Sequence, residues 1–517
     1  MLRAELYPGV ELPRDGLLND LLHAESARPE APAIRFSDGQ TWSVGELARR
    51  ARACAATLRA HGVDRGDRVA ILGRGDLRMF AWFCGIYLLG AVEGQVNTDL
   101  RGPVLRHVMD DLDPALIVAK PEGAAALDEL GGHWAPVIDF DDDFPAEGLA
   151  DFDMVPSRPG DLAAIMYTSG TSGPSKGVML SQGYFSNLGA VLAGVYHFGP
   201  DDVIYHLMSL YHVDSHMVLA GCLQTGAVLA VPDKFSASRF WQQMSAVGAT
   251  GFLATGSMLA AIRKNPPPDP SLPLKAKWGL AAPLPEDLIE YYKGLGITIV
   301  EGYGQTEANL PVVMPLDASR LGGLGIACSA FDIAIHTPED REVPTGEHGE
   351  IVYRPNYPDV VTMGYWGRPE ATLANMRGLW WHTGDRGFID DDGYLYFVGR
   401  LKDSLRYRGE NVSAWELEQI VRQAPGLVDA AAIGVIDELG GEDEIKVFVV
   451  LEDGAAFDPE GLFAYCEQNL ARFAVPRYVE PISATAVVRS PGTGVIQKHL
   501  LPTEHGAQMS DRLKRTT

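Results

Sequence analysis

The stretch Tyr167-Thr-Ser-Gly-Thr-Ser-Gly-Pro-Ser-Lys-Gly177 decides how the rest of the chain is interpreted. It follows an apolar, strand-like run over residues 162–167. Its glycines allow sharp turns that bring backbone N–H groups close to an anion, its hydroxyl groups add donors, and Lys176 supplies positive charge. These glycine and hydroxyl residues are Thr168, Ser169, Gly170, Thr171, Ser172, Gly173 and Gly177. The stretch therefore predicts a loop that holds a polyphosphate.

The spacing around the lysine differs from that of a Walker phosphate loop, in which Gly precedes the Lys and Ser or Thr follows it. Here Ser175 precedes Lys176 and Gly177 follows. Taken alone, the stretch is also compatible with a solvent-exposed Gly/Ser turn. Its order resembles the phosphate loop of the adenylate-forming superfamily, which includes acyl-CoA synthetases, luciferases and peptide-synthetase adenylation domains.

This resemblance, which covers about residues 40–500, implies an α/β fold in two parts. The family has a large N-terminal adenylate-forming domain, made of α/β subdomains and a small β-rich subdomain, and a small mobile α+β C-terminal domain. The expected boundaries are 1–401 and 402–517, with the hinge at Lys402. A helix–turn–strand rhythm near the N-terminus agrees, because a capping box at Ser43-Val-Gly-Glu46 precedes a strand candidate at 68–72.

The composition excludes several classes of protein. A chain of 517 residues with 46% hydrophobic residues can bury large cores, and a net charge of −25 disfavours binding to nucleic acid or anionic membranes. The cysteines are scattered and never form a Cys-x-x-Cys pair, so we expect reduced, buried thiols. The first residues show no long apolar core or cleavage signal, so we expect no leader, and the longest apolar run, 79–92, is too short to span a bilayer. We therefore expect a cytoplasmic protein without a membrane span.

A second glycine-rich segment, Glu301-Gly-Tyr-Gly-Gln-Thr-Glu307, offers a phosphate donor and a hard oxygen ligand suited to Mg²⁺. On its own it is also compatible with a strand-to-helix turn. It resembles the family's adenylate-binding segment, which implies that Tyr303 stacks near adenine and that Thr306 contacts the α-phosphate. The resemblance implies that Glu307 and Thr171 bind Mg²⁺.

The same resemblance assigns further nucleotide contacts. Small residues after a strand-like segment would flank the adenine, glycines would allow close approach, and an Asp and an Arg would contact the ribose and the nucleotide. These residues are Ala281, Ala282, Pro283, Gly302, Gly304, Asp385 and Arg400. The cofactors implied are ATP or an acyl-AMP, Mg²⁺ and coenzyme A.

Two segments resemble the branch of carnitine-CoA ligases and fatty-acid-transport-type acyl-CoA synthetases. They are Val96-Asn-Thr-Asp-Leu-Arg-Gly102 and Gly409-Glu-Asn-Val-Ser413. In the second, Gly409 matches the position that the incoming pantetheine approaches, and the neighbouring charged residues available to CoA are Arg406, Arg408 and Glu410. These segments favour a CoA ligase over a domain that loads a carrier protein.

The acyl pocket is predicted less specifically. Tyr211-His212 matches an aromatic–His pair that lines the acyl pocket in the family, and the other candidate wall residues are Val213, Asp214, His216, Leu280 and Tyr303. A lone His on an apolar helix is, by contrast, usually a structural group. The aromatic and apolar candidates suit a bulky hydrophobic acid, of the kind found in natural-product pathways, whereas the carnitine-like branch would permit a polar acyl chain.

One position departs from the family pattern. Members carry a catalytic lysine in a sequence like Thr-Gly-Lys-Ile-x-Lys, but this chain has Thr493-Gly-Val-Ile-Gln-Lys498, so Val495 stands at the lysine position. In the family this lysine stabilises charge that develops during adenylation and leaves the site before CoA attacks. Removing one such donor costs about 10²–10³ in rate. We therefore expect that adenylation is impaired. We also expect that the enzyme forms the thioester from a ready-made acyl-adenylate, which a separate adenylating enzyme supplies.

Two alternatives stay open at this point. Lys498 or another cation reaches the site and an ordinary two-step ATP-dependent synthesis takes place, or the chain is a non-catalytic nucleotide-binding homologue. The same catalytic candidates apply whether the enzyme only forms the thioester or also carries out adenylation. They are Thr168, Lys176, Thr306, Glu307, Lys402 and Gly409.

Overall fold

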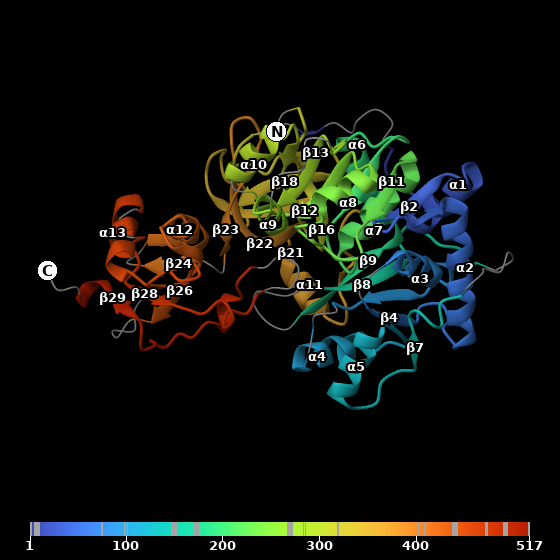
Figure 1. Cartoon of the computed structure of the whole chain (residues 1–517), viewed down its shortest axis with the longest axis horizontal. Helices are drawn as coiled ribbons and strands as arrows, with labels where there is room; N and C mark the ends of the chain where they lie inside the picture. The colour runs from blue at the N-terminus through green and yellow to red at the C-terminus, as the bar shows by residue number, and fades with distance from the viewer. Residues whose placement is uncertain are drawn as a thin grey trace. The chain divides into compact units, whose positions relative to one another are not determined.

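Alternating strands and helices build two seven-stranded sheets, followed by smaller, mainly antiparallel sheets (Figure 1). The structure is a computed structural model. It describes the chain except for residues 1–2, 5–10, 74–75, 98–99, 101, 146–153, 169–174, 266–271, 283, 285, 318–319, 402–403, 408–409, 437–442, 471–473, 490–494 and 515–517. The mixed α/β architecture predicted from the sequence is confirmed.

The first seven-stranded sheet contains the strands around the predicted phosphate loop. Its order is β20-β9-β8-β5-β4-β6-β7. The strands span, in that order, Gly364–Tyr365, Lys176–Ser181, Leu162–Thr168, Val92–Gln95, Arg68–Leu72, Leu116–Ala119 and Val137–Asp139. β4 to β8 are paired in parallel, whereas β9 runs antiparallel to β8 and β20 antiparallel to β9. The helices among these strands are α3 (Leu77–Leu88), α4 (Gly102–Leu112) and α5 (Pro121–Leu130).

The second seven-stranded sheet is parallel except at one edge. Its order is β14-β13-β12-β10-β11-β2-β3. The strands span Thr298–Val300, Trp278–Ala282, Gly251–Thr255, Val203–His206, Val228–Val231, Pro32–Phe36 and Thr41–Ser43, of which β3 is antiparallel to β2. The associated helices are α1 (Leu17–Ala27), α2 (Val44–Ala60), α6 (Gln182–Val195), α7 (Val213–Thr225), α8 (Phe240–Val247), α9 (Gly256–Arg263) and α10 (Glu286–Gly294).

Small residues bring the central helices close together. A Cβ on Gly85 of α3 would lie 2.8 Å from the Cβ of Cys54 on α2, and one on Gly189 of α6 would lie 2.8 Å from the carbonyl oxygen of Met217 on α7. Any larger side chain at either glycine would push the helices apart. This close packing buries α3, α6 and α7 almost completely.

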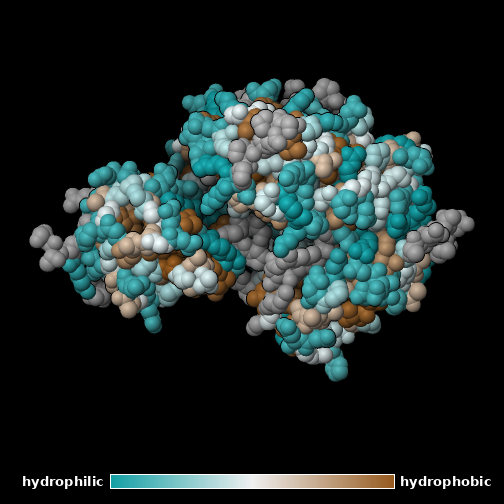
Figure 2. All heavy atoms as spheres, in the orientation of Figure 1, coloured by the Kyte–Doolittle hydropathy of each residue, from teal (hydrophilic) through white to brown (hydrophobic). Residues whose placement is uncertain are grey.

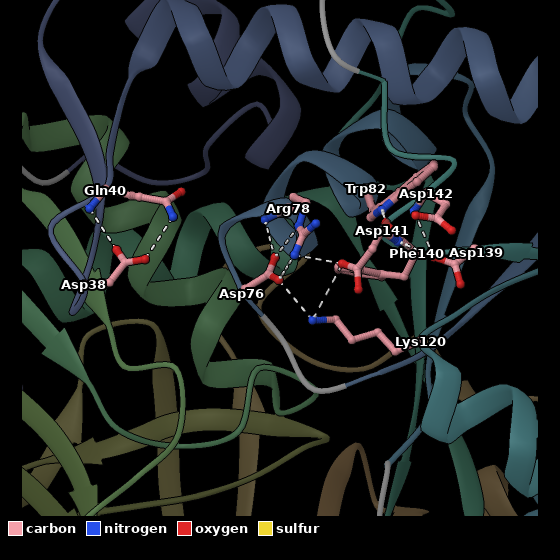
Figure 3. Close-up of polar contacts among 10 residues, drawn as sticks. All are labelled: Asp38, Gln40, Asp76, Arg78, Trp82, Lys120, Asp139, Phe140, Asp141 and Asp142. Carbon is pink, nitrogen blue, oxygen red and sulfur yellow. Dashed lines mark hydrogen bonds and ion pairs between the residues drawn. The ribbon is translucent and has the colours of Figure 1, made fainter.

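Ion pairs connect the carboxyl ends of three strands of the first sheet (Figure 3). Asp76 follows β4 and caps α3 by accepting the backbone N–H of Arg78 at 2.9 Å. Its carboxylate also contacts the guanidinium of Arg78 at 2.6 Å and Lys120, which follows β6, at 2.9 Å. Asp141, beyond β7, contacts Arg78 at 2.7 Å. These partners satisfy one another's charges, so we interpret the network as structural.

The remaining sheets are smaller. A four-stranded sheet has the order β1-β17-β16-β15, and another contains β18-β19-β22-β21 with β23 beside β22. The first comprises Arg3–Ala4, Ile326–Cys328, Ala308–Val313 and Gly302–Gln305; the second comprises Phe331–His336, Gly349–Pro355, Trp380–Ile389, Met376–Arg377 and Leu395–Arg400. Helix α11 (Pro369–Asn375) lies between β20 and β21 along the chain.

A four-stranded sheet of order β26-β27-β28-β29 forms the C-terminal part, with a separate hairpin of β24 and β25. The strands span Leu427–Ile436, Asp443–Leu451, Tyr478–Pro481, Ser510–Asp511, Ser404–Tyr407 and Glu410–Ser413; the helices are α12 (Ala414–Val421) and α13 (Pro459–Asn469). Both helices lie by the sheet in Figure 1 and share its apolar core. The βαβ-like order expected at this end is present as β27-α13-β28, in which the two strands are parallel.

The chain divides into two compact units. One contains Met1–Ile333, Tyr353–Trp381 and Asp392–Leu395, and the other contains Ala334–Val352, His382–Asp391 and Tyr396–Thr517. The hinge position Lys402 lies outside the described residues. The boundary between 401 and 402 therefore stays a prediction.

Several local predictions are confirmed. Ser43 caps α2, since its Oγ accepts the backbone N–H of Glu46 at 3.2 Å. The strand candidates at 68–72 and 116–119 have these bounds in the structure. All five cysteines are free and buried. Within the described ranges, no helix is both long and apolar enough to cross a bilayer, and hydrophilic residues cover much of the visible face (Figure 2).

Candidate functional site

The predicted phosphate loop connects two antiparallel strands. Thr168 at the end of β8 faces Lys176 at the start of β9, and Tyr167 faces Gly177. A Cβ on Gly177 would lie 2.6 Å from the Cγ2 of Ile165, so this position requires glycine. The ends of the loop are therefore held as a hairpin. The loop residues themselves, Ser169, Gly170, Thr171, Ser172 and Gly173, lie outside the described residues.

The base of this hairpin is anchored by Asp111 of α4. Its carboxylate accepts the hydroxyl of Tyr167 at 2.9 Å and pairs with Arg368 at 2.6 Å. Its backbone carbonyl accepts the indole N–H of Trp366 at 3.1 Å. The hairpin, α4 and the segment around β20 are thereby joined at one point.

Tyr365 brings two predicted catalytic residues together. Its hydroxyl donates a hydrogen bond of 2.6 Å to Oε1 of Glu307, while the Nζ of Lys176 lies 4.7 Å from the centre of its ring. β20 pairs with β9 and puts Tyr365 opposite Val178, beside the start of β9. Lys176 and Glu307 are far apart in sequence, but both contact the side chain of Tyr365.

Thr306 and Glu307 occupy the turn between β15 and β16, so the second glycine-rich segment is a β-hairpin. A Cβ on Gly304 would lie 2.6 Å from the backbone nitrogen of Leu310, which explains the glycine. The hydroxyl of Tyr184 on α6 donates to the carbonyl oxygen of Thr306 at 2.9 Å. The carbonyl of Glu307 accepts the N–H of Thr362 at 2.7 Å. The turn is therefore fixed from several sides.

The adenine candidates lie on neighbouring elements of the same unit. Ala281 is buried on β13 and Ala282 is exposed at its end, whereas Pro283 lies outside the described residues. Gly302 and Tyr303 belong to β15, and Tyr303 is buried. A Cβ on Gly302 would lie 3.6 Å from a methyl carbon of Leu280, one of the acyl candidates.

Most acyl candidates gather at the N-terminus of α7. The rings of Tyr211 and His212 are 4.6 Å apart, and Val213 begins the helix. Oδ1 of Asp214 accepts the amide of Asn309 on β16 at 2.8 Å, which links α7 to the Thr306 hairpin. Burial lowers the pKa of His212, although Asp214 opposes this shift.

His216 differs from the other acyl candidates because it is fully buried in a hydrogen-bonded network. Its Nε2 lies 2.9 Å from the carboxylate of Glu93 and its Nδ1 lies 3.0 Å from Oγ of Ser215. The ring stacks on Phe83 at 4.2 Å and on Phe185 at 4.8 Å. These contacts give His216 a packing role, and its place in an acyl pocket stays a prediction.

In the other unit, the ribose and nucleotide candidates form an ion pair. Nε of Arg400, at the end of β23, lies 3.1 Å from Oδ1 of Asp385 on β22. Asp385 is buried, and its backbone N–H donates to Oγ1 of Thr383 at 3.0 Å. Thr383 in turn donates to the carbonyl of Ile351 on β19 at 2.6 Å. Asp385 is thus rigidly placed by two neighbouring strands.

The CoA candidates lie around the hairpin of β24 and β25. Arg406 pairs with Asn411 and Tyr407 with Glu410 in this ladder, where only the backbones of Arg406 and Glu410 are described. Arg408 and Gly409 lie outside the described residues.

Val495 is exposed at 54%, whereas Lys498 is bound to a neighbour. The ammonium of Lys498 lies 2.8 Å from Oε1 of Glu418 on α12, and the side chains retain only 15% and 4% exposure. Burial raises the pKa of Glu418, and Lys498 opposes the shift. The same oxygen of Glu418 accepts the N–H of Ala432 at 2.6 Å.

The chain matches known proteins in two regions. Residues 22–366 match the family described as AMP-binding enzyme, and residues 416–490 match its C-terminal domain. The chain belongs to the AMP-binding enzyme family. As a member of its adenylate-forming acyl-CoA ligases, it is an acid–thiol ligase.

Several known proteins are similar to this AMP-binding enzyme over most of its length. A feruloyl-CoA synthase from an Amycolatopsis species is 33% identical, over 87% of this chain and 92% of that protein. A crotonobetaine/carnitine-CoA ligase from Salmonella agona is 28% identical, over 85% and 89%. The ATP-bound structure of MatB from Rhodopseudomonas palustris has a TM-score of 0.81 at 27% identity, over 93% and 98%.

Sequence reasoning missed Tyr365 and Glu301 in the AMP-binding enzyme. Tyr365 sits in the segment Met363-Gly-Tyr-Trp366, but nothing in that pattern indicates its contact with Glu307. Glu301 opens the second glycine-rich segment and is 8% exposed. Burial raises its pKa to about 7, while a hydrogen bond from the N–H of Leu284 opposes this shift.

Tyr365→Phe is expected to lower the rate of thioester formation about 10-fold, because the turn that carries Thr306, the predicted phosphate ligand, loses the hydrogen bond of 2.6 Å that holds its neighbour Glu307. The ring that faces Lys176 stays in place. Steady-state kinetics with acyl-adenylate and CoA would measure the loss. Tyr357→Phe is the matched control, since this tyrosine is only half-buried and outside the hairpins. Equal rates for Tyr365→Phe and Tyr357→Phe would show that the hydrogen bond from Tyr365 to Glu307 does not support the reaction.

Glu301→Gln is expected to change how stability depends on pH. The native carboxyl, with a pKa of about 7, retains its proton above pH 4.5, where the unfolded one loses it, so wild-type stability falls as pH rises through this window. The full shift corresponds to about 3 kcal/mol. The free energy of unfolding of the variant lacks this fall, so the variant becomes more stable relative to wild type as the pH rises from 4.5 to 8. Urea unfolding at both pH values tests this, with exposed Glu290→Gln as control; parallel curves for wild type and Glu301→Gln would refute it.

Proposed function

We propose that this enzyme converts an acyl-adenylate and coenzyme A into an acyl-CoA thioester and AMP, and that its own adenylation step is impaired. In the reaction, the CoA sulfur attacks the acyl carbonyl carbon and loses its proton. The bond between that carbon and the phosphate oxygen breaks, and AMP leaves with the electron pair. No pyrophosphate is formed in this half-reaction.

A single observation carries the proposal: a valine occupies the position of the family's adenylation lysine. Valine offers neither charge nor a hydrogen bond to charge that develops around the α-phosphorus. The exposed fraction of 54% means that Val495 is not there to fill a core. Because this lysine acts in adenylation and not in thioester formation, its loss separates the two half-reactions.

The contacts of Lys498 support impaired adenylation over rescue by a nearby cation. Its ammonium is 2.8 Å from the buried carboxylate of Glu418. Withdrawing it would leave this carboxylate, which is 4% exposed, with only the more distant Arg422, at 4.0 Å, as an ion-pair partner among the described residues. Breaking a buried pair costs up to about 3–5 kcal/mol when no other charge compensates the carboxylate, and Arg422 would compensate Glu418 only in part. Lys498 is therefore a poor substitute for the missing lysine.

The other predicted residues take the roles that the family resemblance implies. Lys176, Thr168 and Thr306 would hold the phosphate of the adenylate, Asp385 would bind its ribose, and Arg400 would contact the nucleotide. Glu307 fits Mg²⁺ as a buried carboxylate held by Tyr365. When bound, this ion would neutralise the charge of ATP phosphates in any residual adenylation.

A hydrophobic aromatic acid is the first substrate class to test. Tyr211 and His212 are partly exposed aromatic side chains, Val213 and Leu280 are buried apolar ones, and a similar protein is named a feruloyl-CoA synthase. Feruloyl-adenylate, a long-chain acyl-adenylate and a polycyclic acyl-adenylate make a suitable panel, each compared with the free acid plus ATP and Mg²⁺.

The deciding experiment follows CoA-thioester and pyrophosphate exchange for each member of the panel. We expect thioester from at least one adenylate and little exchange with the matching acid. Brisk exchange would establish the ordinary two-step synthetase instead, and its loss in Lys498→Gln would identify Lys498 as the substitute. If no adenylate in the panel reacts while AMP still binds, a non-catalytic nucleotide-binding role is favoured. A separate adenylating enzyme is the expected source of the substrate.

A further inference from the structure

Three side chains with metal-binding groups converge beside β22. His336, Asp340 and His382 each offer one ligand atom, and these atoms all lie within 4.8 Å of one another. The histidines are 5% and 3% exposed, and Asp340 is only partly exposed. Two imidazoles and one carboxylate form a donor set that suits Zn²⁺ and neighbouring divalent transition metals.

A tight turn places the carboxylate. His336 ends β18, and the N–H of Thr337 donates to the carbonyl of Arg341 at 2.8 Å while that of Asp340 donates to the carbonyl of Thr337 at 3.0 Å. Asp340 has a φ of 59°, a left-handed conformation that Asp tolerates better than most residues. The turn thereby folds Asp340 back toward β22.

Glu350 orients the second histidine. Its Oε2 lies 2.8 Å from Nδ1 of His382, and its Oε1 accepts the N–H of Gly384 at 3.0 Å. With Nδ1 directed to Glu350, His382 presents Nε2 to Oδ1 of Asp340, 3.5 Å away. A carboxylate behind a histidine in this way is the usual outer partner of a metal-bound imidazole, because it fixes the tautomer and the ring.

The separation of 3.5 Å between His382 and Asp340 is informative. A direct charge-assisted hydrogen bond would be about 2.7–2.9 Å. Two ligands of one tetrahedral ion, each about 2.0–2.2 Å from it, lie about 3.3–3.6 Å apart. The rings of His336 and His382 meet edge to face, with centres 6.2 Å apart, and a nitrogen of each lies within 4.8 Å of the other and of the Asp340 carboxylate.

We propose that His336, Asp340 and His382 bind a divalent transition-metal ion of the Zn²⁺ class, with Glu350 as the outer partner and solvent at the remaining position. The ion would join the turn after β18 to β22. His382 lies three residues before Asp385 on that strand. The site would therefore stabilise the segment that carries the predicted ribose ligand, and it would be distinct from the proposed Mg²⁺ position at Glu307.

Titration of the purified full-length protein with Zn²⁺ alone, followed by calorimetry and metal analysis, tests this proposal. We expect one equivalent to bind and to raise the melting temperature, and Co²⁺ to give the absorption bands of a tetrahedral N/O site. His336→Ala and Asp340→Asn should each lower affinity by more than the 10–100-fold cost of losing an outer partner, and Glu350→Gln by about that cost.

His348→Ala is the matched control, because this exposed histidine lies in the same loop region and stacks on Phe388. It should bind Zn²⁺ like wild type. Asp340→Asn keeps the size and the turn preference of Asp, and its metal-free melting temperature reports whether the fold is retained. Absence of a bound equivalent in wild type, or equal affinity in Asp340→Asn, His336→Ala and wild type, would overturn the proposal.

Discussion

Replacing Val495 with lysine is expected to raise ATP–pyrophosphate exchange by about 10²–10³-fold with a cognate acid. Under the proposed function, a lysine at this position would restore a charged donor to the α-phosphorus in the transition state of adenylation. Val495 is 54% exposed, so the longer side chain needs no repacking of a core. Radiolabelled pyrophosphate incorporated into ATP gives the rate directly.

The control is Val495→Leu, which changes size without adding charge and should leave exchange at the wild-type level. Thioester formation from preformed adenylate should change little in both variants, since the proposal gives a lysine at this position no role in that step. A wild-type enzyme that already exchanges as fast as Val495→Lys would show that another cation replaces the lysine. The measured exchange rates thus distinguish an enzyme that lacks the cationic donor for adenylation from one in which another cation takes its place.

Asp385→Asn is expected to lower kcat/KM for the acyl-adenylate by about 10–100-fold, mainly through KM. Hydrogen bonds to a charged partner contribute about 1.5–3 kcal/mol, and the ribose diol would lose such bonds. Asn keeps the shape of the buried side chain, so the backbone bond to Thr383 can persist. Initial-rate kinetics across adenylate concentrations would show the effect.

The ion pair with Arg400, at 3.1 Å, gives this prediction a competing explanation. If Asp385 only holds Arg400, then Arg400→Gln and Asp385→Asn should lower the melting temperature alike and leave KM unchanged. Exposed Asp391→Asn provides a matched charge control on the same segment. A KM near wild type in folded Asp385→Asn would remove Asp385 from the nucleotide site.

Local patterns predicted much of the fold. The capping box at Ser43 and the strand candidates at 68–72 and 116–119 depend on neighbours in sequence, and the structure confirms them. The order of motifs also indicated the enzyme class, because a phosphate loop, an adenylate segment and a C-terminal domain follow one another in the family. These signals are carried by short segments that need no knowledge of tertiary contacts.

Contacts between distant segments could not be predicted in the same way. Tyr365 meets Glu307 only because a two-residue strand pairs with β9, and the burial that raises the pKa of Glu301 is a property of the packed hairpin. The convergence of His336 with His382 likewise requires β18 and β22 to belong to one sheet. The roles of the predicted site residues stay predictions until the variants are measured.

The two-residue strand β20 has a consequence beyond the site. It covers part of the outer edge of β9, in a sheet whose exposed backbone groups could otherwise pair with another chain. Gly364 is required there, since its φ is 114° and a Cβ would lie 2.7 Å from Thr372. Disruption of this short strand would therefore weaken the hydrogen bond from Tyr365 to Glu307. At the same time, it would expose the edge of β9 to pairing with another chain and hence to aggregation.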